Sequence, residues 1–199
     1  MRVLALPLVL LAFHGSLQPL PAPLRSELVG AGMWHPGCPV PLSRLSLLTV
    51  SFWGFDGHVH GGRLVVDEAA ARPLLGVFGR LYALRFPIRE MRPVGNTGDD
   101  TSAFECRDAV PSPCPGTRPT GQWSEHAYGE AVDLNPIENP YTGCGRTREH
   151  ASIPYLDRTN VRKGMVTPAV VAAFRAIGWG WGGDWAATKD YMHFSANGH

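Results

Sequence analysis

The stretch that decides the fold reads Ser124-Glu125-His126-Ala127-Tyr128-Gly129-Glu130-Ala131-Val132-Asp133, and Asp190-Tyr191-Met192-His193 complements it near the end of the chain. Two imidazoles and one carboxylate can hold Zn²⁺ in three tetrahedral positions and leave the fourth to water. A further carboxylate three residues before the last histidine could handle that water's protons. The pattern therefore predicts one zinc ion bound by His126, Asp133 and His193, with Asp190 as the acid–base group, and it indicates a hydrolase.

The spacing of these residues also predicts their local structure. Gly129 allows the backbone to turn tightly after His126, and residues 131–134 then predict a short strand that carries Asp133 back toward the histidine. Residues 191–195 predict a second strand, whose alternation puts Tyr191, His193 and Ser195 on one face. A lone histidine or aspartate is ordinarily a surface or a satisfied core residue, but that interpretation would have to explain two separate polar clusters at once.

The two clusters together form the motif Ser-x-His-x-x-Gly-x-Ala-x-Asp, followed by an acidic residue and, three positions on, a histidine. This motif resembles the zinc D-alanyl-D-alanine peptidases of the VanX/VanY type, and most closely the secreted VanY-like carboxypeptidase branch. L-alanyl-D-glutamate endopeptidases and phage lysins belong to the same group. The resemblance runs from about Trp34 to Ser195 and takes in further segments: Gly37–Val40, Thr101–Arg107, Asn135-Pro136, Asn139–Tyr141 and Gly178–Trp185.

The resemblance also implies roles for individual residues. It makes His126, Asp133 and His193 the zinc ligands and places Asp190 where VanX-like members carry a catalytic glutamate. Ser124 matches a family serine that contacts the substrate. Arg107 is the candidate for an arginine that polarises the scissile carbonyl or binds a terminal carboxylate, with the alternatives that it forms a surface ion pair or that one of two other arginines takes the role. Those two substitutes are Arg89 and Arg92.

The function implied is that of a secreted zinc metallopeptidase, a D-alanyl-D-alanine carboxypeptidase that hydrolyses peptidoglycan stem peptides. One alternative is an L-alanyl-D-glutamate-type peptidoglycan endopeptidase, and another is a non-catalytic zinc-containing module that binds the cell wall. Asp190 favours an enzyme, because a binding module would not need an acid at the open metal position. A host-lysing phage enzyme is a third alternative, and the N-terminal leader argues against it.

Other polar and aromatic residues carry weaker signals. His58 and His60 alternate as metal chelators can, but glycines surround them and predict a hairpin with a structural or exposed role. Asp184 is a rival for the catalytic base, although its setting between glycine and tryptophan favours a turn or cap. The tryptophans of the segment before Asp190 could line a substrate cleft or pack in the core: Trp179, Trp181 and Trp185.

Length and charge restrict the domain organisation and the possible partners. The chain has 199 residues, which suits one domain with a substantial core, and we expect a monomer. Its net charge is +1, with no long run of either sign, so no nucleic-acid partner is expected.

The N-terminus is typical of an export signal. Arg2 precedes an apolar run over residues 3–13 that is too short for a permanent transmembrane helix. We therefore expect residues 1–30 to be a signal peptide or leader with a Pro-rich linker, and residues 31–199 to be the catalytic domain. A small residue such as Gly15, Ser16 or Ala22 could mark a cleavage site, and retention as an uncleaved anchor stays open. A secreted or cell-wall-associated protein without a stable membrane span after leader removal is expected.

Four cysteines support an oxidising compartment, and none lies in a Cys-x-x-Cys pair, so disulfides are favoured over a second metal site. Three connectivities are possible. Cys38 and Cys106 fall in segments that resemble the family, whereas Cys114 and Cys144 flank the active-site stretch. The resemblance therefore favours Cys38–Cys106 and Cys114–Cys144.

The remaining pattern predicts a mixed fold. Residues 45–51 and 63–66 predict strands, and a helix follows with Leu74, Val77, Phe78 and Leu81 on one face and Pro73 in its first turn. A second helix begins at Thr167, buries four apolar residues and ends at Gly178. The buried residues are expected to be Val170, Val171, Phe174 and Ile177. This order predicts a single α+β domain with a small antiparallel sheet and flanking helices. The resemblance implies the same hedgehog-related fold, with zinc held over the sheet.

Overall fold

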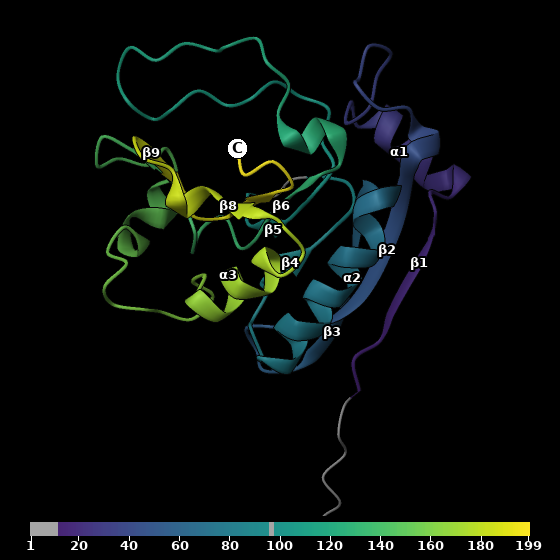
Figure 1. Ribbon diagram of the computed structural model, residues 1–199, viewed down its shortest axis with the longest axis horizontal. Coiled ribbons are helices and arrows are strands. Elements are labelled where there is room, and N and C mark those ends of the chain that lie inside the picture. Colours follow the sequence, from purple (N-terminus) through teal and green to yellow (C-terminus); the bar gives the residue numbers. More distant parts are fainter. Residues whose placement is uncertain (1–11, 96–97) are drawn as a thin grey trace, which may run out of the picture.

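The computed structural model describes residues 12–95 and 98–199, and Figure 1 shows its course. Its regular elements, in chain order, are β1 (Gly15–Pro19), α1 (Ala22–Gly30), η1 (Leu42–Arg44), β2 (Leu45–Trp53), β3 (Val59–Asp67), α2 (Glu68–Ala83), β4 (Glu90–Met91), β5 (Asp100–Thr101), η2 (Glu125–Tyr128), β6 (Ala131–Asp133), β7 (Tyr141–Gly143), η3 (His150–Tyr155), α3 (Pro168–Arg175), β8 (Gly180–Trp181), η4 (Gly182–Asp184), β9 (Thr188–Asp190) and β10 (His193–Ser195).

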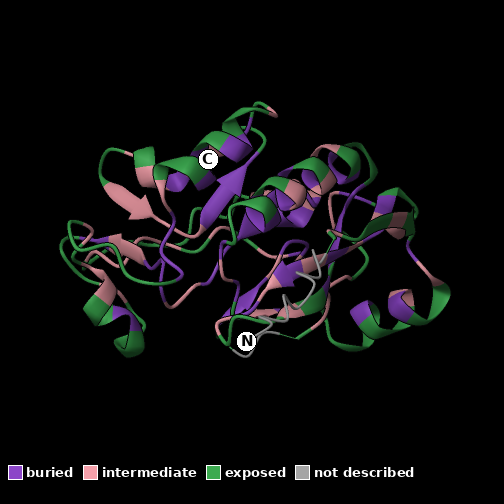
Figure 2. Ribbon diagram, turned by 90° about the horizontal axis from the view of Figure 1, so that it is seen from below, coloured by how far each residue is buried: buried purple, intermediate pink, exposed green. Residues whose placement is uncertain are grey.

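The N-terminal half is built on an antiparallel sheet in the order β1-β2-β3. Successive residues of a strand point to opposite faces, so β2 contributes to two apolar clusters. Leu48, Val50 and Phe52 pack in the main core with the buried face of α2, which lies across the sheet in Figure 1. Both faces of β2 are therefore covered, and none of its residues is exposed. Figure 2 shows helices that carry both buried and exposed residues, as expected for helices packed on a core.

The second apolar cluster lies on the other face of the sheet, beneath α1. Leu20, Leu24 and Leu28 are buried there together with Leu45 and other residues of the strands. Residues 15–30, which the sequence places in a leader and linker, thus form an edge strand and a packed helix in this structure. Most of the apolar run at residues 3–13 lies outside the described residues.

The two helices predicted from the sequence carry the expected apolar faces, but one begins earlier than expected. Leu74, Val77, Phe78 and Leu81 of α2 are all buried. Pro73 lies inside the helix and not in its first turn. The reason is that the side chain of Asp67 accepts a hydrogen bond from the backbone N–H of Ala69 and starts the helix upstream.

The second helix, α3, begins with Pro168 after Thr167, as the sequence predicts. Val170, Val171 and Phe174 are buried, whereas Ile177 lies beyond the end of the helix and is only partly buried. Trp179 also belongs to the main core.

The C-terminal half carries a second antiparallel sheet in the order β6-β10-β8. Phe194 of β10 faces the main core and stacks on Phe174 of α3, with ring centroids 3.9 Å apart. Alternation along β10 then points His193 and Ser195 to the opposite face. The predicted strand 191–195 was too long at its start. Tyr191 is outside β10, and its ring lies beside Trp181.

Both expected disulfides are present. Cys38 is bonded to Cys106 and Cys114 to Cys144, which confirms the favoured connectivity. The α+β expectation is also confirmed, since small antiparallel sheets and helices make up the described residues, with β4 and β5 as a parallel pair. None of the helices in residues 12–95 and 98–199 is long and apolar enough to cross a membrane.

Gly129 provides a test of the turn that links η2 to β6. Its φ is +73°, and a Cβ atom built there would lie 2.6 Å from the backbone nitrogen of Asp67. We expect Gly129→Ala to lower the free energy of unfolding by more than about 1 kcal/mol, measured by urea denaturation. Gly145→Ala is the matched control, because its φ is +70° but no atom lies within 4 Å of the added Cβ. Equal losses in the two variants would contradict the role of the close contact at Gly129.

Candidate metal centre and substrate cavity

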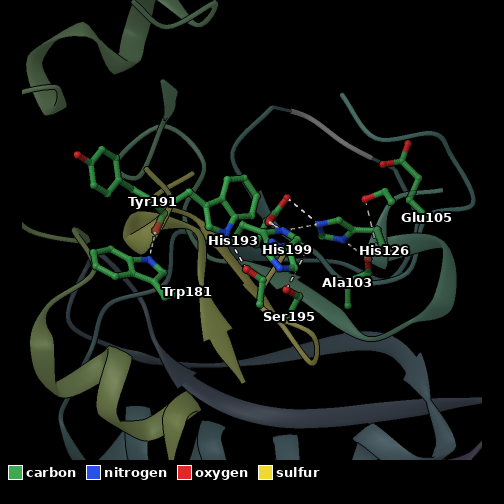
Figure 3. A network of polar contacts seen from close by, with 12 residues as sticks. Ala103, Glu105, His126, Trp181, Tyr191, His193, Ser195 and His199 are labelled. Atoms are coloured by element: carbon green, nitrogen blue, oxygen red, sulfur yellow. Dashed lines mark hydrogen bonds and ion pairs between the residues drawn. The ribbon is translucent and has the colours of Figure 1, made fainter. Parts of the chain in front are cut away.

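Three buried side chains converge on one point between η2, β6 and β10 (Figure 3). The Nε2 atom of His126 lies 3.3 Å from Nδ1 of His193 and 3.2 Å from Oδ2 of Asp133. The Nδ1 atom of His193 lies 3.1 Å from Oδ1 of Asp133. The three residues chosen from the sequence as ligands therefore come together at hydrogen-bonding distance.

The local folding explains this convergence. Asp133 and His193 are paired directly across the antiparallel strands β6 and β10, so their side chains emerge side by side. His126 lies in η2, whose N-terminus is capped by the hydroxyl of Ser124, which accepts a hydrogen bond from the backbone N–H of His126. Gly129 ends η2 in the left-handed conformation and returns the chain to β6.

Two backbone carbonyl groups orient the histidine rings. Nδ1 of His126 faces the carbonyl oxygen of Ala103, and Nε2 of His193 faces that of His199 at 3.1 Å. A carbonyl oxygen only accepts hydrogen bonds, so these ring nitrogens carry the protons. In neutral rings, the opposite nitrogens then present their lone pairs to the point of convergence, as metal-binding histidines do.

The site fits a zinc ion. Tetrahedral bonds of 2.0–2.1 Å would place ligand atoms about 3.3 Å apart, close to the separations found here. Burial by itself would raise the pKa of Asp133, but the charge of His126 and hydrogen bonds from both histidines lower it, so Asp133 presents a carboxylate. Burial would lower the pKa of His193, but Asp133 outweighs it and raises the pKa. The cluster thus favours a positive charge at its centre.

A second group of possible metal ligands is excluded by a disulfide bond. His35 lies near Cys38 and Cys106, but the two cysteines are joined in a disulfide, so their sulfur atoms are not thiolate ligands. His58 and His60 lie at the β2–β3 hairpin, as expected, and face the exposed carboxylate of Asp56.

A cavity of about 460 Å³ opens over the three ligands. All six residues selected from the sequence for the site line this cavity: Arg107, Ser124, His126, Asp133, Asp190 and His193. Apolar side chains form much of the remaining wall: Val110, Trp123, Tyr141, Trp185 and Met192. Trp185 thus contributes to the cavity, whereas Trp179 belongs to the core and Trp181 packs against it.

Asp190 has the environment of an acid–base group. It ends β9, which pairs with β7, and its Oδ1 atom is shielded from solvent and makes no hydrogen bond within the described residues. Burial, followed by repulsion from the carboxylate of Asp133, raises the pKa of Asp190 to about 7. His193 and Arg107 act in the opposite direction through their charges. Such a group can exchange a proton near neutral pH.

Of the three arginines considered from the sequence, Arg107 is the one that lines the cavity, and Arg148 lines it as well. The Nε of Arg107 donates to Glu105 at 2.7 Å, and Nη1 donates to the carbonyl oxygen of Asp108 at 3.3 Å, which holds the guanidinium in place. The two substitutes lie elsewhere. Arg89 pairs with Asp99 and Glu138, and Arg92 pairs with Glu90.

Asp184 lies outside the cavity lining. Its carboxylate is exposed and pairs with Arg175 at 2.7 Å on the surface. This setting agrees with the structural role that the sequence favours for Asp184.

Several residues around the site carry no chemical signal in the sequence. The carbonyl groups of Ala103 and His199 act through the backbone, which every residue possesses. Ser152 is buried in η3, lines the cavity and has no hydrogen-bond partner for its hydroxyl within the described residues. Tyr141 is paired with Asp190 across β7 and β9. The two residues are far apart in the sequence, so the sequence alone does not reveal this pairing.

Comparison with known protein families found a match over the C-terminal part of the chain. A family model described as D-alanyl-D-alanine carboxypeptidase matches residues 117–196, a span that contains the three candidate ligands and Asp190. The match supports a peptidase of this kind, and peptidases of this group are typically zinc-dependent. No solved structure matches the chain.

The metal centre is testable without any assay of activity. We expect elemental analysis of the purified protein to find about one zinc per chain, and His126→Ala or His193→Ala to remove most of it, because each deletes one of three ligands. His60→Ala is the matched control, as its imidazole is partly exposed and lies outside the cluster. Unchanged metal content in both ligand variants would overturn the assignment.

Proposed function

We propose that the protein is an extracytoplasmic zinc metallopeptidase that removes the terminal D-alanine from peptidoglycan stem peptides. The observation that carries this proposal is the convergence of two imidazole lone pairs and one carboxylate on the wall of a cavity that also contains Asp190 and Arg107. The matched family description supports the same substrate class. The two disulfides support a location outside the reducing cytoplasm.

His126, Asp133 and His193 would hold the zinc ion and leave one position open toward the cavity. When bound, zinc lowers the pKa of a coordinated water and polarises a carbonyl group. The main-chain oxygens of Ala103 and His199 orient both histidine rings for this task.

Asp190 would accept the proton of the attacking water and deliver it to the leaving amine. The group must be ionised to accept a proton, so activity is lost as the pH falls through its pKa. Burial raises that pKa to about 7, whereas a bound cation beside Asp133 would lower it again. We therefore expect the acidic limb of the pH profile at or below about pH 7.

Arg107 would bind the substrate. Its guanidinium is held by Glu105 but still lines the cavity, and its charge acts on Asp190. A planar guanidinium can donate two parallel hydrogen bonds to a terminal carboxylate, or it can stabilise the negative charge that develops on the scissile carbonyl oxygen.

The activity is tested by mass spectrometry of defined muropeptides after incubation with the zinc-loaded protein. We expect pentapeptide stems to lose one D-alanine, and Asp190→Asn to keep its zinc while turnover falls by roughly 10² or more. Asp184→Asn is the matched control, since Asp184 is a surface residue paired with Arg175, and it should retain activity. Cleavage between L-alanine and D-glutamate would instead indicate an endopeptidase. The absence of any product would indicate a binding module.

The role of Arg107 is tested with Arg107→Lys, which keeps the charge but removes the planar fork of donors. We expect a large loss of kcat/KM on the free-acid substrate. A substrate with an amidated C-terminus separates the two roles. If Arg107 binds the terminal carboxylate, the amide is a poor substrate for the wild type and the variant adds little further loss. If it serves the scissile carbonyl, the variant loses activity on both substrates alike. A variant that matched the wild type on both would exclude Arg107 from the site.

A further inference from the structure

The segment 196–199 folds back over the outer side of His193 (Figure 3). The main-chain oxygen of His199 lies 3.1 Å from Nε2 of His193 and also accepts a hydrogen bond of 2.9 Å from the hydroxyl of Ser195. Ser195 and His193 lie on the same face of β10, two residues apart, so both side chains reach the same oxygen. One backbone oxygen is thus held between a predicted zinc ligand and a buried serine.

The segment is anchored at several points. The indole N–H of Trp185 donates to the carbonyl oxygen of Gly198 at 2.7 Å, and the Trp185 ring lies beside that of His193, with centroids 5.6 Å apart. The side chain of Asn197 accepts a hydrogen bond of 2.8 Å from the backbone N–H of His199. Gly180 allows close packing, because a Cβ atom there would lie 2.5 Å from Cα of Gly198.

The position of the His199 carbonyl matters for the chemistry of His193. A neutral imidazole carries its proton on either nitrogen, and the acceptor that one nitrogen meets decides which tautomer forms. With Nε2–H bonded to His199, the Nδ1 lone pair points at His126 and Asp133. Without that acceptor, the proton could move to Nδ1 and the ring could turn, so the site would lose a ligand.

The two histidines differ in how their orienting carbonyls are supported. His126 faces Ala103, a buried residue of the main core. His193 faces the segment 196–199, whose residues 196 and 197 are exposed and which depends on a few side-chain hydrogen bonds. The orientation of His193 is therefore the one that single substitutions can loosen.

We propose that Trp185 and Ser195 are positioning residues for the metal: they hold the His199 carbonyl so that His193 presents Nδ1 to zinc. This inference rests on the zinc site of the proposed function. Under this inference, Trp185 orients a metal ligand in addition to lining the cavity, and the buried hydroxyl of Ser195 has the same orienting role.

The test uses the full chain with Trp185→Phe, Ser195→Ala and the double variant. The zinc dissociation constant is measured by competition with a chromophoric chelator, so no substrate is involved. Loss of partners that orient a metal ligand typically weakens metal affinity by about 10- to 100-fold, which we expect for the double variant. Trp181→Phe is the matched control, because it also removes an indole hydrogen bond to a backbone carbonyl at 3.0 Å, but the acceptor, Tyr191, lies outside the segment.

A spectroscopic measurement separates positioning from general stability. Long-range ¹H–¹⁵N spectra of the imidazoles should show a proton on Nε2 of His193 in the wild type and in Trp181→Phe, and a mixture of tautomers in the double variant. The melting temperature of each protein reports any loss of folding. Unchanged zinc affinity and an unchanged His193 tautomer in the double variant would overturn the inference.

The outcome is distinguishable from failure of the proposed function. If the wild type binds no zinc, the metallopeptidase proposal fails, and the spectra of the zinc-free proteins at alkaline pH, where imidazoles are neutral, still decide whether Trp185 and Ser195 set the tautomer. If the wild type binds zinc and only the double variant loses affinity, both proposals are supported.

Discussion

The structure depends on one electrostatic constraint, which is that two imidazole lone pairs and a carboxylate meet in a buried place. Such a group of acceptors repels itself unless a positive charge lies among them. Neighbouring elements bring these groups together: β6 and β10 align Asp133 with His193, and η2 positions His126 beside them. Because the ligands are assembled only in the folded chain, a cation bound here would also contribute to folding stability.

The sequence predicts the fold best where a signal is local. Thr167 followed by Pro168 marks the start of α3, and the apolar spacing of α2 marks its buried face, because both depend on neighbouring residues. Pro73 predicts the wrong start for α2, because the N-cap residue Asp67 lies upstream of it. The packing of the helix on the sheet tolerates a proline inside the helix. Residues 15–30, expected in a leader and linker, form an edge strand and a packed helix through contacts with β2, which is distant in the sequence and leaves no local signal.

The same distinction applies to the site. The ligands are predictable because metal chemistry restricts which side chains can serve and at what spacing. The surrounding carbonyl groups are not, since a backbone oxygen leaves no mark in the sequence. The asparagine–proline segments illustrate a third case. Asn135 and Asn139 are wholly buried and their amides bind backbone carbonyls such as that of Gly164, so this motif stabilises the loops behind the site.

The edge strand β1 determines what any trimming of the N-terminus would expose. It pairs with β2 along its whole length, and the helix after it covers Leu45 and Leu47. Proteolytic trimming at Ala22 would remove β1 and leave the nine-residue β2 with an open edge, while α1 would still cover Leu45 and Leu47. Open, apolar edges template pairing between molecules. Trimming at this point would therefore convert a capped sheet into one prone to self-association, so the place of cleavage would decide between a dispersed and an aggregating product.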